Sequence, residues 1–252
     1  MFLSWPVELG RICGNIWAGV PGTSVSTERD FGVKMAFDFE PQFSVALPKT
    51  MRETLPATTN RANRILKRGF DILFAGIALV LLAPVFGIVA LALRLRERGP
   101  IFFSHKRVGA NGEEFACHKF RTMKTDGDRQ LEWMLAIDPI ARAEWEADRK
   151  LERDPRVHAI GNILRRTSLD ELPQFWNVLK GDMSIVGPRP ITWSEAEKYG
   201  MHFADYCAVK PGITGAWQVG GRSDTSYDYR VGLDVDYVRN ATFLDDIRIV
   251  FK

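Results

Sequence analysis

Two adjacent carboxylates, Asp170 and Glu171, follow the basic residues Arg165 and Arg166 where a helical pattern begins. Carboxylates can serve as nucleophiles or metal ligands, and arginine binds phosphate oxygens through paired N–H groups. The only long uncharged apolar run of the chain lies well before them, from Ile72 to Leu93. This combination predicts chemistry on a phosphorylated substrate at a membrane surface.

The carboxylate pair also has a purely structural explanation. Ser168-Leu169-Asp170-Glu171 matches the capping-box pattern, and apolar residues then recur at helical spacing. Acidic residues favour helix starts because they meet the positive end of the helix dipole, so Glu171 could simply complete the box. Pro173 must lie near the first turn, since a proline further inside would break the helix. A helix start would, however, also attract a phosphate and keep Asp170 ionised.

The apolar run predicts a membrane element. As one helix it would reach roughly 33 Å, enough to cross the bilayer core, and its all-round hydrophobicity argues against a buried helix of a soluble protein. Basic residues on both sides draw both ends to the cytoplasm, and Pro84 strains the helix near its middle. We therefore expect a re-entrant hairpin broken at Pro84 rather than a simple span. The flanking basic residues are Lys67, Arg68, Arg94, Arg96, Arg98, Lys106 and Arg107.

Composition narrows the function classes. The chain of 252 residues can hold one sizeable domain, a membrane element and a tail. Its formal net charge of +3 is too small to indicate nucleic-acid binding, so we expect no nucleic-acid partner. The three cysteines are isolated and odd in number, which argues against a disulfide framework and fits a reducing compartment. The N-terminal residues lack the pattern of a secretory signal.

The residues after Gly99-Pro100 have the pattern of a soluble domain. Residues 101–104 and 115–120 are strand candidates joined by a turn that carries Arg107. From Asp126 to about Leu151 the composition predicts helix, with a break at Pro139. The four histidines have no metal-ligand spacing.

Two later segments carry arginines in restrained positions. Met183 to Val186 predicts a short strand, followed by a stiff turn in which two prolines flank Arg189 and aim its guanidinium; an ordinary rigid turn is the alternative. Residues 210–222 form a glycine-rich stretch ending in Arg222, which we interpret as a loop. Such loops bring backbone N–H groups close to phosphates, although this one lacks the lysine-serine/threonine ending of a P-loop.

The patterns together predict an α+β fold, a mainly helical, membrane-associated catalytic domain with a small β-hairpin or sheet and an N-terminal re-entrant helix–break–helix. The expected division is a poorly ordered extension at residues 1–62, a membrane hairpin at 63–98 and a cytoplasmic catalytic domain at 99–252. A weak membrane contact through Phe2 and Trp5 is the alternative for the extension.

Taken in order, these motifs resemble the bacterial sugar transferases, the monotopic phosphoglycosyl transferases that prime surface-polysaccharide assembly. The resemblance runs from about Asn63 to Lys252. Each motif alone is weak, but the set is specific. The motifs are Lys67 to Asp71, Lys119 to Met123, Ser168 to Gln174, Gly187 to Pro190 and Lys210 to Arg222. One departure is Ala83-Pro84, where the family hairpin often breaks at Ser-Pro.

The resemblance implies transfer of a sugar-1-phosphate from a UDP-sugar to undecaprenyl phosphate, with Mg²⁺ and release of UMP. Asp170 would attack the β-phosphorus to give a covalent phosphosugar-aspartate, and Glu171 would hold Mg²⁺. The enzyme would act at the cytoplasmic leaflet of the bacterial inner membrane. The sequence does not identify the sugar, and galactose or glucose is the expectation for a member with a polysaccharide role. A homo-oligomer is compatible with the sequence. The implied substrate-binding residues are Lys119, Arg121, Arg165, Arg189, Arg222 and Asp234.

Two other functions compete with this interpretation. A non-catalytic, membrane-anchored assembly scaffold of the same fold would have no need of Asp170, Glu171, Arg165 and Arg189 together. A single-span glycosyltransferase would use the pair Asp126 and Asp128 on a metal, although these residues lie in a charged stretch typical of a solvated turn. Such an enzyme would release UDP rather than UMP.

Overall fold

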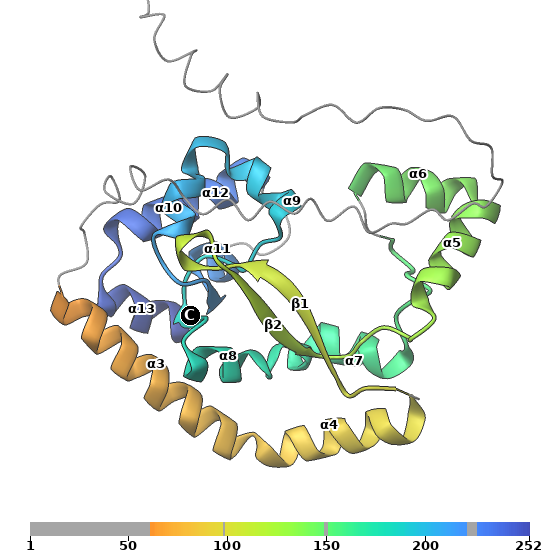
Figure 1. Cartoon of the computed structure of the whole chain (residues 1–252), viewed down its shortest axis with the longest axis horizontal. Coiled ribbons are helices and arrows are strands. Elements are labelled where there is room, and N and C mark those ends of the chain that lie inside the picture. The colour runs from red at the N-terminus through yellow and green to blue at the C-terminus, as the bar shows by residue number, and fades with distance from the viewer. Residues whose placement is uncertain (1–60, 98, 149–150, 221–225) are drawn as a thin grey trace, which may run out of the picture. The chain divides into compact units, whose positions relative to one another are not determined.

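The computed structural model describes residues 61–97, 99–148, 151–220 and 226–252, all within one compact unit. They are mostly helical, with two small sheets (Figure 1). The helices are α3 (Arg61–Leu81), α4 (Ala83–Arg96), α5 (Gly127–Ile137), α6 (Pro139–Asp148), α7 (Ala159–Thr167), α8 (Gln174–Lys180), α9 (Trp193–Ala196), α10 (Phe203–Cys207), α11 (Ala216–Gly220), α12 (Tyr227–Asn240) and α13 (Phe243–Val250). The strands are β1 (Phe102–Val108), β2 (Glu114–Phe120), β3 (Ser184–Val186) and β4 (Gly212–Thr214), and the 3₁₀ turns are η1 (Ala110–Gly112), η2 (Leu169–Glu171) and η3 (Glu197–His202). The described residues begin at Arg61, so nearly all of the expected N-terminal extension lies outside them.

The apolar run forms two helices, α3 and α4, that meet at a bend of 57°. The break falls at Leu82, and Pro84 lies in the first turn of α4, where its missing N–H leaves no helical bond unmade. The predicted break is therefore confirmed. By length and composition, no single described helix could cross a membrane, whereas the bent pair together meets the criteria for a broken span or a re-entrant loop.

The predicted strand–turn–strand is confirmed as an antiparallel hairpin of β1 and β2, with Val108 opposite Glu114 next to the turn. The first strand runs further than expected, so Arg107 lies in β1 rather than in the turn. The helical stretch broken at Pro139 is also confirmed, as α5 and α6. The expected strand before the Arg189 turn is β3.

The 210–222 stretch differs from the expected loop over its described part. It contains β4, which pairs in parallel with β3, followed by the short helix α11. The close packing of the two strands explains the glycines, because a Cβ on Gly212 would overlap the backbone of Gly187. The stretch thereby holds the Arg189 turn in place from the side, with Gly212 N donating to Pro188 O.

The capping-box prediction at Ser168 was wrong. Ser168 adopts the left-handed conformation (φ 56°) at the end of α7, and its side chain makes no capping hydrogen bond. The chain then makes the turn η2, and α8 begins only at Gln174, after Pro173. The carboxylates therefore lie in a tight connection between two helices rather than in the first turn of a long one.

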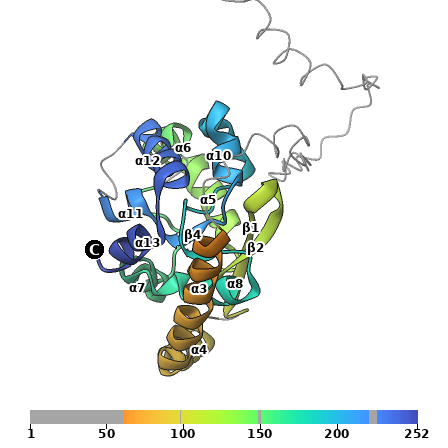
Figure 2. The same cartoon turned by 90° about the vertical axis from the view of Figure 1, so that its left-hand side faces the viewer.

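The helix pair packs on the rest of the described chain through two apolar clusters. Helix α3 places Ala75 against β2, α8 and β3, whereas α4 places Leu93 against Phe120 and Leu164. In both views α3 and α4 lie along one side, with α10 and α12 on the other (Figures 1 and 2). The expected division between a membrane hairpin and a catalytic domain at residues 98 and 99 stays a prediction. Helix α3 packs closely against elements of the expected catalytic domain.

Asn177 docks α8 on the hairpin. Its side chain is fully buried, accepts from His118 N (3.0 Å) and donates to Ala116 O (2.7 Å). We expect Asn177→Ala to lower the free energy of unfolding by about 2–3 kcal/mol, because both backbone groups lose their partner. Denaturant unfolding in detergent would measure the change, with the exposed Asn240→Ala as the matched control. Equal losses in the two variants would contradict this docking role.

Candidate active site

A pocket forms where the hairpin, the turn η2, the Arg189 turn and the β4–α11 segment meet. Four polypeptide segments that are distant in the sequence contribute to it, and basic side chains dominate its charge. The lining residues are Arg107, Cys117, Lys119, Glu171, Gln174, Arg189, Pro190, Ile213 and Gln218.

The hairpin supplies one wall through the alternation of its side chains. Lys119 and Cys117 are two residues apart on β2 and therefore face the same side. Arg107 lies opposite Phe115 in the register, which places it on that side of β1 as well. The strand pairing thus gives the pocket two cations from one sheet face.

Asp170 and Glu171 reach this region from the left-handed turn at Ser168. Glu171 lines the pocket, and its Oε1 accepts from Lys119 Nζ at 2.6 Å. Asp170 is 8% exposed and precedes Glu171 in the turn, but it is not among the lining residues. The connection therefore separates the pair into one buried carboxyl and one carboxylate on the pocket wall.

The two carboxyl groups differ in their protonation. Burial raises the pKa of Asp170, and the neighbouring Glu171 raises it further, against the attraction of Lys119 and Arg165. Burial is also the largest influence on Glu171, but Lys119 and Arg189 together outweigh it, so the pKa of Glu171 lies below its usual value. Paired carboxyls whose pKa values are driven apart are typical of sites in which the two have different roles.

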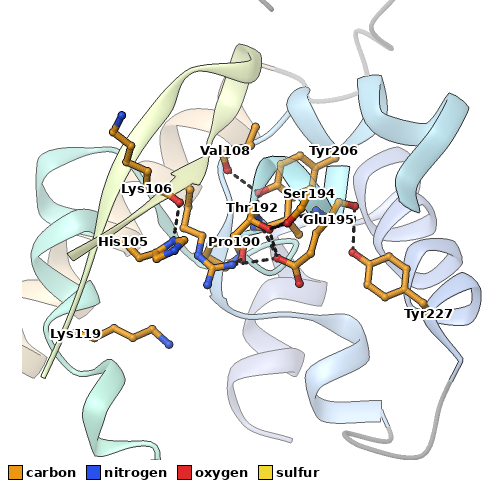
Figure 3. A network of polar contacts seen from close by, with 12 residues as sticks. His105, Lys106, Val108, Lys119, Pro190, Thr192, Ser194, Glu195, Tyr206 and Tyr227 are labelled. Carbon is orange, nitrogen blue, oxygen red and sulfur yellow. Dashed lines mark hydrogen bonds and ion pairs between the residues drawn. The ribbon is translucent and has the colours of Figure 1, made fainter. Parts of the chain in front are cut away.

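Arg189 lies where the sequence predicted, on the rigid turn after β3, and lines the pocket with its side chain exposed. Beside it, Arg107 donates to Pro190 O (3.3 Å) and to Glu195 Oε2 (3.1 Å). Glu195 also completes the capping box of α9 with Thr192, and Lys119 extends from the hairpin below this network (Figure 3). Arg107 is thus held in place, whereas the Arg189 side chain makes no hydrogen bond or ion pair with the described residues.

Of the remaining arginines, Arg165 lies near Asp170 without lining the pocket, and Arg121 lies apart from both. Arg165 Nε donates to Thr122 Oγ1 (2.9 Å), and its charge acts on Asp170. Arg121 follows the end of β2, is 6% exposed and donates to Glu97 O at 3.3 Å, near the end of α4. It is not among the residues that line the pocket, so its role in substrate binding stays a prediction.

Asp234 lies elsewhere in the fold. It is 2% exposed on α12, where it accepts from Tyr199 at 2.8 Å, and burial raises its pKa to about 7. Its assignment to the site stays a prediction, and Arg222 falls outside the described residues. Asp126 lies on the surface beside α5, bonded to Gln130 (3.0 Å), and does not line the pocket.

Sequence reasoning missed several lining residues. In the sequence Arg107 belongs with the basic residues that flank the apolar run, but counting in steps of two from Lys119 across the expected hairpin identifies it as a lining residue. Cys117 could be found in the same way. Gln218 gave no comparable signal, because the helix α11 that carries it was expected to be loop.

The residues fit a divalent cation only in part. Mg²⁺ commonly takes one or two carboxylates and completes its oxygen shell with substrate phosphates and water. Glu171 is such a donor on the pocket wall, and within the described ranges no cluster of three or more His, Cys, Asp or Glu could hold a metal unaided. The donor set therefore suits an ion that arrives with a diphosphate.

A carboxyl pair facing lysine and arginine side chains is the arrangement of an enzyme site for phosphorylated substrates. The family model described as bacterial sugar transferase matches residues 62–252. The chain belongs to the bacterial sugar transferase family, as the motifs predicted.

Curated relatives agree with this membership. The chain is 50% identical over 193 residues to the undecaprenyl-phosphate galactose phosphotransferase of Salmonella typhimurium, covering 76% of this chain and 40% of that protein. It is 47% identical over 186 residues to the exopolysaccharide production protein ExoY of Rhizobium meliloti, covering 74% and 82%. It is 42% identical over 197 residues to the UDP-glucose:undecaprenyl-phosphate glucose-1-phosphate transferase of Escherichia coli, covering 75% and 39%. The chain thus spans about two fifths of two of these relatives and most of the third.

Proposed function

We propose that this protein transfers a hexose-1-phosphate, galactose or glucose, from a UDP-sugar to undecaprenyl phosphate and releases UMP. This would be the first membrane step of exopolysaccharide synthesis. The observation that carries the proposal is the carboxyl pair with divergent pKa values beside Lys119, Arg165 and Arg189. The names of the relatives support the substrate class, since they specify undecaprenyl phosphate with galactose or glucose.

In the first step, a carboxylate oxygen of Asp170 forms a bond to the β-phosphorus of the UDP-sugar. The bond between that phosphorus and the oxygen bridging it to the α-phosphorus breaks, and UMP departs with the bridging oxygen and its electron pair. In the second step, a phosphate oxygen of the lipid attacks the same phosphorus and the bond to Asp170 breaks. The carboxylate is regenerated, and neither step requires a net proton.

The surrounding side chains stabilise the negative charges of the phosphates and carboxylates during this exchange. Arg189 and Arg165 bind the phosphate oxygens, and Lys119 favours the ionised form of both carboxyl groups. Glu171 would hold the magnesium ion, which when bound offsets the diphosphate charge and helps UMP to leave. Burial of Asp170 reduces its hydration and so favours attack over hydrogen bonding to water.

We further propose that α3 and α4 enter the cytoplasmic leaflet of the bacterial inner membrane as a re-entrant pair. Large apolar side chains on both helices are exposed, which is costly in water and favourable in lipid. This location would bring the soluble donor and the lipid acceptor to one pocket. The exposed residues are Ile65, Leu66, Ile72, Leu73, Ile77, Val80, Leu81, Ile88, Leu91 and Leu95.

The direct test is to incubate the detergent-solubilised protein with undecaprenyl phosphate, Mg²⁺ and a panel of UDP-sugars. We expect UMP and a lipid diphosphate sugar in equal amounts with UDP-galactose or UDP-glucose. Release of UDP would instead indicate transfer of the sugar without its phosphate. No nucleotide release with any donor would overturn the proposal.

The pH dependence of kcat/KM should reveal the role of Lys119. Asp170 must be ionised to attack, so the rate falls on the acid side as Asp170 takes up a proton. Because Lys119 lowers the pKa of Asp170, Lys119→Met should raise that pKa and move the acid limb to higher pH. A pH–rate profile of both proteins would measure the shift, and an acid limb that stays in place would contradict it.

A further inference from the structure

Helix α3 carries charged side chains that reach into the catalytic unit just before the apolar residues begin. Lys67 is the central one, and its side chain is 26% exposed. Its ammonium group donates to Val186 O (2.8 Å), Tyr237 Oη (3.2 Å) and Asp246 Oδ2 (2.8 Å). Tyr237 donates in turn to Asp246 Oδ1 at 2.6 Å, and Asp246 is 3% exposed. Three elements, α3, α12 and α13, thus meet at the last carbonyl of β3.

Two further charged residues of α3 bind neighbouring backbone groups. Asp71 accepts a hydrogen bond from Ile185 N at 2.9 Å, in the strand β3 that ends at Val186. Arg68 donates to Val178 O (2.6 Å) and Leu179 O (2.9 Å) near the end of α8. The same helix is therefore bound to β3, which leads to Arg189, and to α8, which follows the carboxyl pair.

The connection from Val186 to Arg189 is short and stiff. Gly187 N donates to Thr214 O at 2.9 Å, and Pro188 fixes the next backbone angle. A shift of the Val186 carbonyl would therefore move the guanidinium of Arg189 relative to the pocket, since little between them can absorb it. A misplacement of about 1 Å at a transferring phosphate can cost on the order of a hundredfold in rate.

We infer that Lys67, Tyr237 and Asp246 are positioning residues for the phosphate-binding Arg189. Lys67 donates to the carbonyl of Val186, and Asp246 holds both the Lys67 ammonium and the Tyr237 hydroxyl beside that carbonyl. The cluster thereby fixes the turn that presents Arg189 on the pocket wall with Glu171. This inference deepens the proposed function and rests on it for its kinetic part. It assigns a catalytic consequence to a cluster that touches neither the pocket nor a substrate.

The test uses variants of the full chain that avoid an uncompensated buried charge. Tyr237→Phe removes only the hydroxyl, and Lys67→Met combined with Asp246→Asn removes both charges of the pair. Asp236→Asn, an exposed aspartate on the same helix as Tyr237, is the matched control. We expect the first two to lower kcat at least tenfold with little change in KM, and the control to leave both unchanged.

A double-mutant cycle with Arg189→Ala separates positioning from general stability. If the cluster acts through Arg189, the same changes should lower kcat less than twofold once Arg189 is gone. Equal fold losses in both backgrounds would overturn the inference, because a stabilising role would not depend on Arg189.

Hydrogen–deuterium exchange tests the inference without any turnover. The peptide covering residues 184–190 should exchange faster in the two cluster variants than in the unaltered protein or Asp236→Asn. Unchanged exchange there would overturn the inference. Failure of the unaltered protein to release UMP would instead overturn the proposed function, and the exchange result would still decide whether the cluster holds the turn.

Discussion

Asp170→Asn is expected to abolish turnover, lowering kcat by roughly a thousandfold or more, because the amide cannot form the acyl phosphate. The covalent step gives a second readout. With a donor labelled in its β-phosphate and no lipid acceptor, the unaltered protein should retain the label and Asp170→Asn should not. Burial already disfavours the charged form of Asp170, so a neutral side chain of the same shape should leave folding intact.

The controls for this variant separate chemistry from damage. Asp236→Asn should keep both turnover and labelling, and thermal unfolding of Asp170→Asn should match that of the unaltered protein. Labelling that persists in Asp170→Asn would contradict the nucleophile assignment. Loss of turnover in Asp128→Asn, with Asp170→Asn active, would favour the alternative glycosyltransferase chemistry.

The elements that the sequence predicted correctly have local causes. The break of the apolar helices follows from the backbone of Pro84, and the hairpin follows from strand-forming runs around a turn. The place of Arg189 on a turn directly after β3 was also predictable, because two prolines flank it. Each of these signals lies within a few residues of the structure it determines, so one sequence was enough.

The features that were missed depend on contacts across the chain. The left-handed residue Ser168 ends α7 despite the capping-box pattern, because α7 and α8 pack into different apolar clusters and need a turn between them. The parallel pairing of β3 with β4 joins a predicted strand to a segment with little strand signal of its own. Lys67 and Asp246 are 179 residues apart, and no local pattern indicates their pairing. Their contribution to the site could be recognised only from the fold.

Arg189→Ala should lower kcat by about 10²–10³-fold, the usual cost of losing one group that binds charge developing in a transition state. Arg189 also helps to keep the pKa of Glu171 low, so its loss weakens the charge on the proposed metal ligand as well. Because the Arg189 side chain is exposed and the turn is held by backbone bonds, the variant should fold normally. Steady-state kinetics with the preferred UDP-sugar would measure the loss.

Two matched substitutions test whether the kcat loss in Arg189→Ala comes from this position and from its paired N–H groups. Arg248→Ala removes an arginine whose side chain is 76% exposed on α13, and it should leave kcat unchanged. Arg189→Lys keeps the charge but loses the paired N–H groups, so its kcat should fall between those of the alanine variant and the unaltered protein. A lysine variant as active as the unaltered protein would mean that charge alone is required. An alanine variant with normal kcat would remove Arg189 from the mechanism, because no other exposed arginine of the described chain occupies that turn.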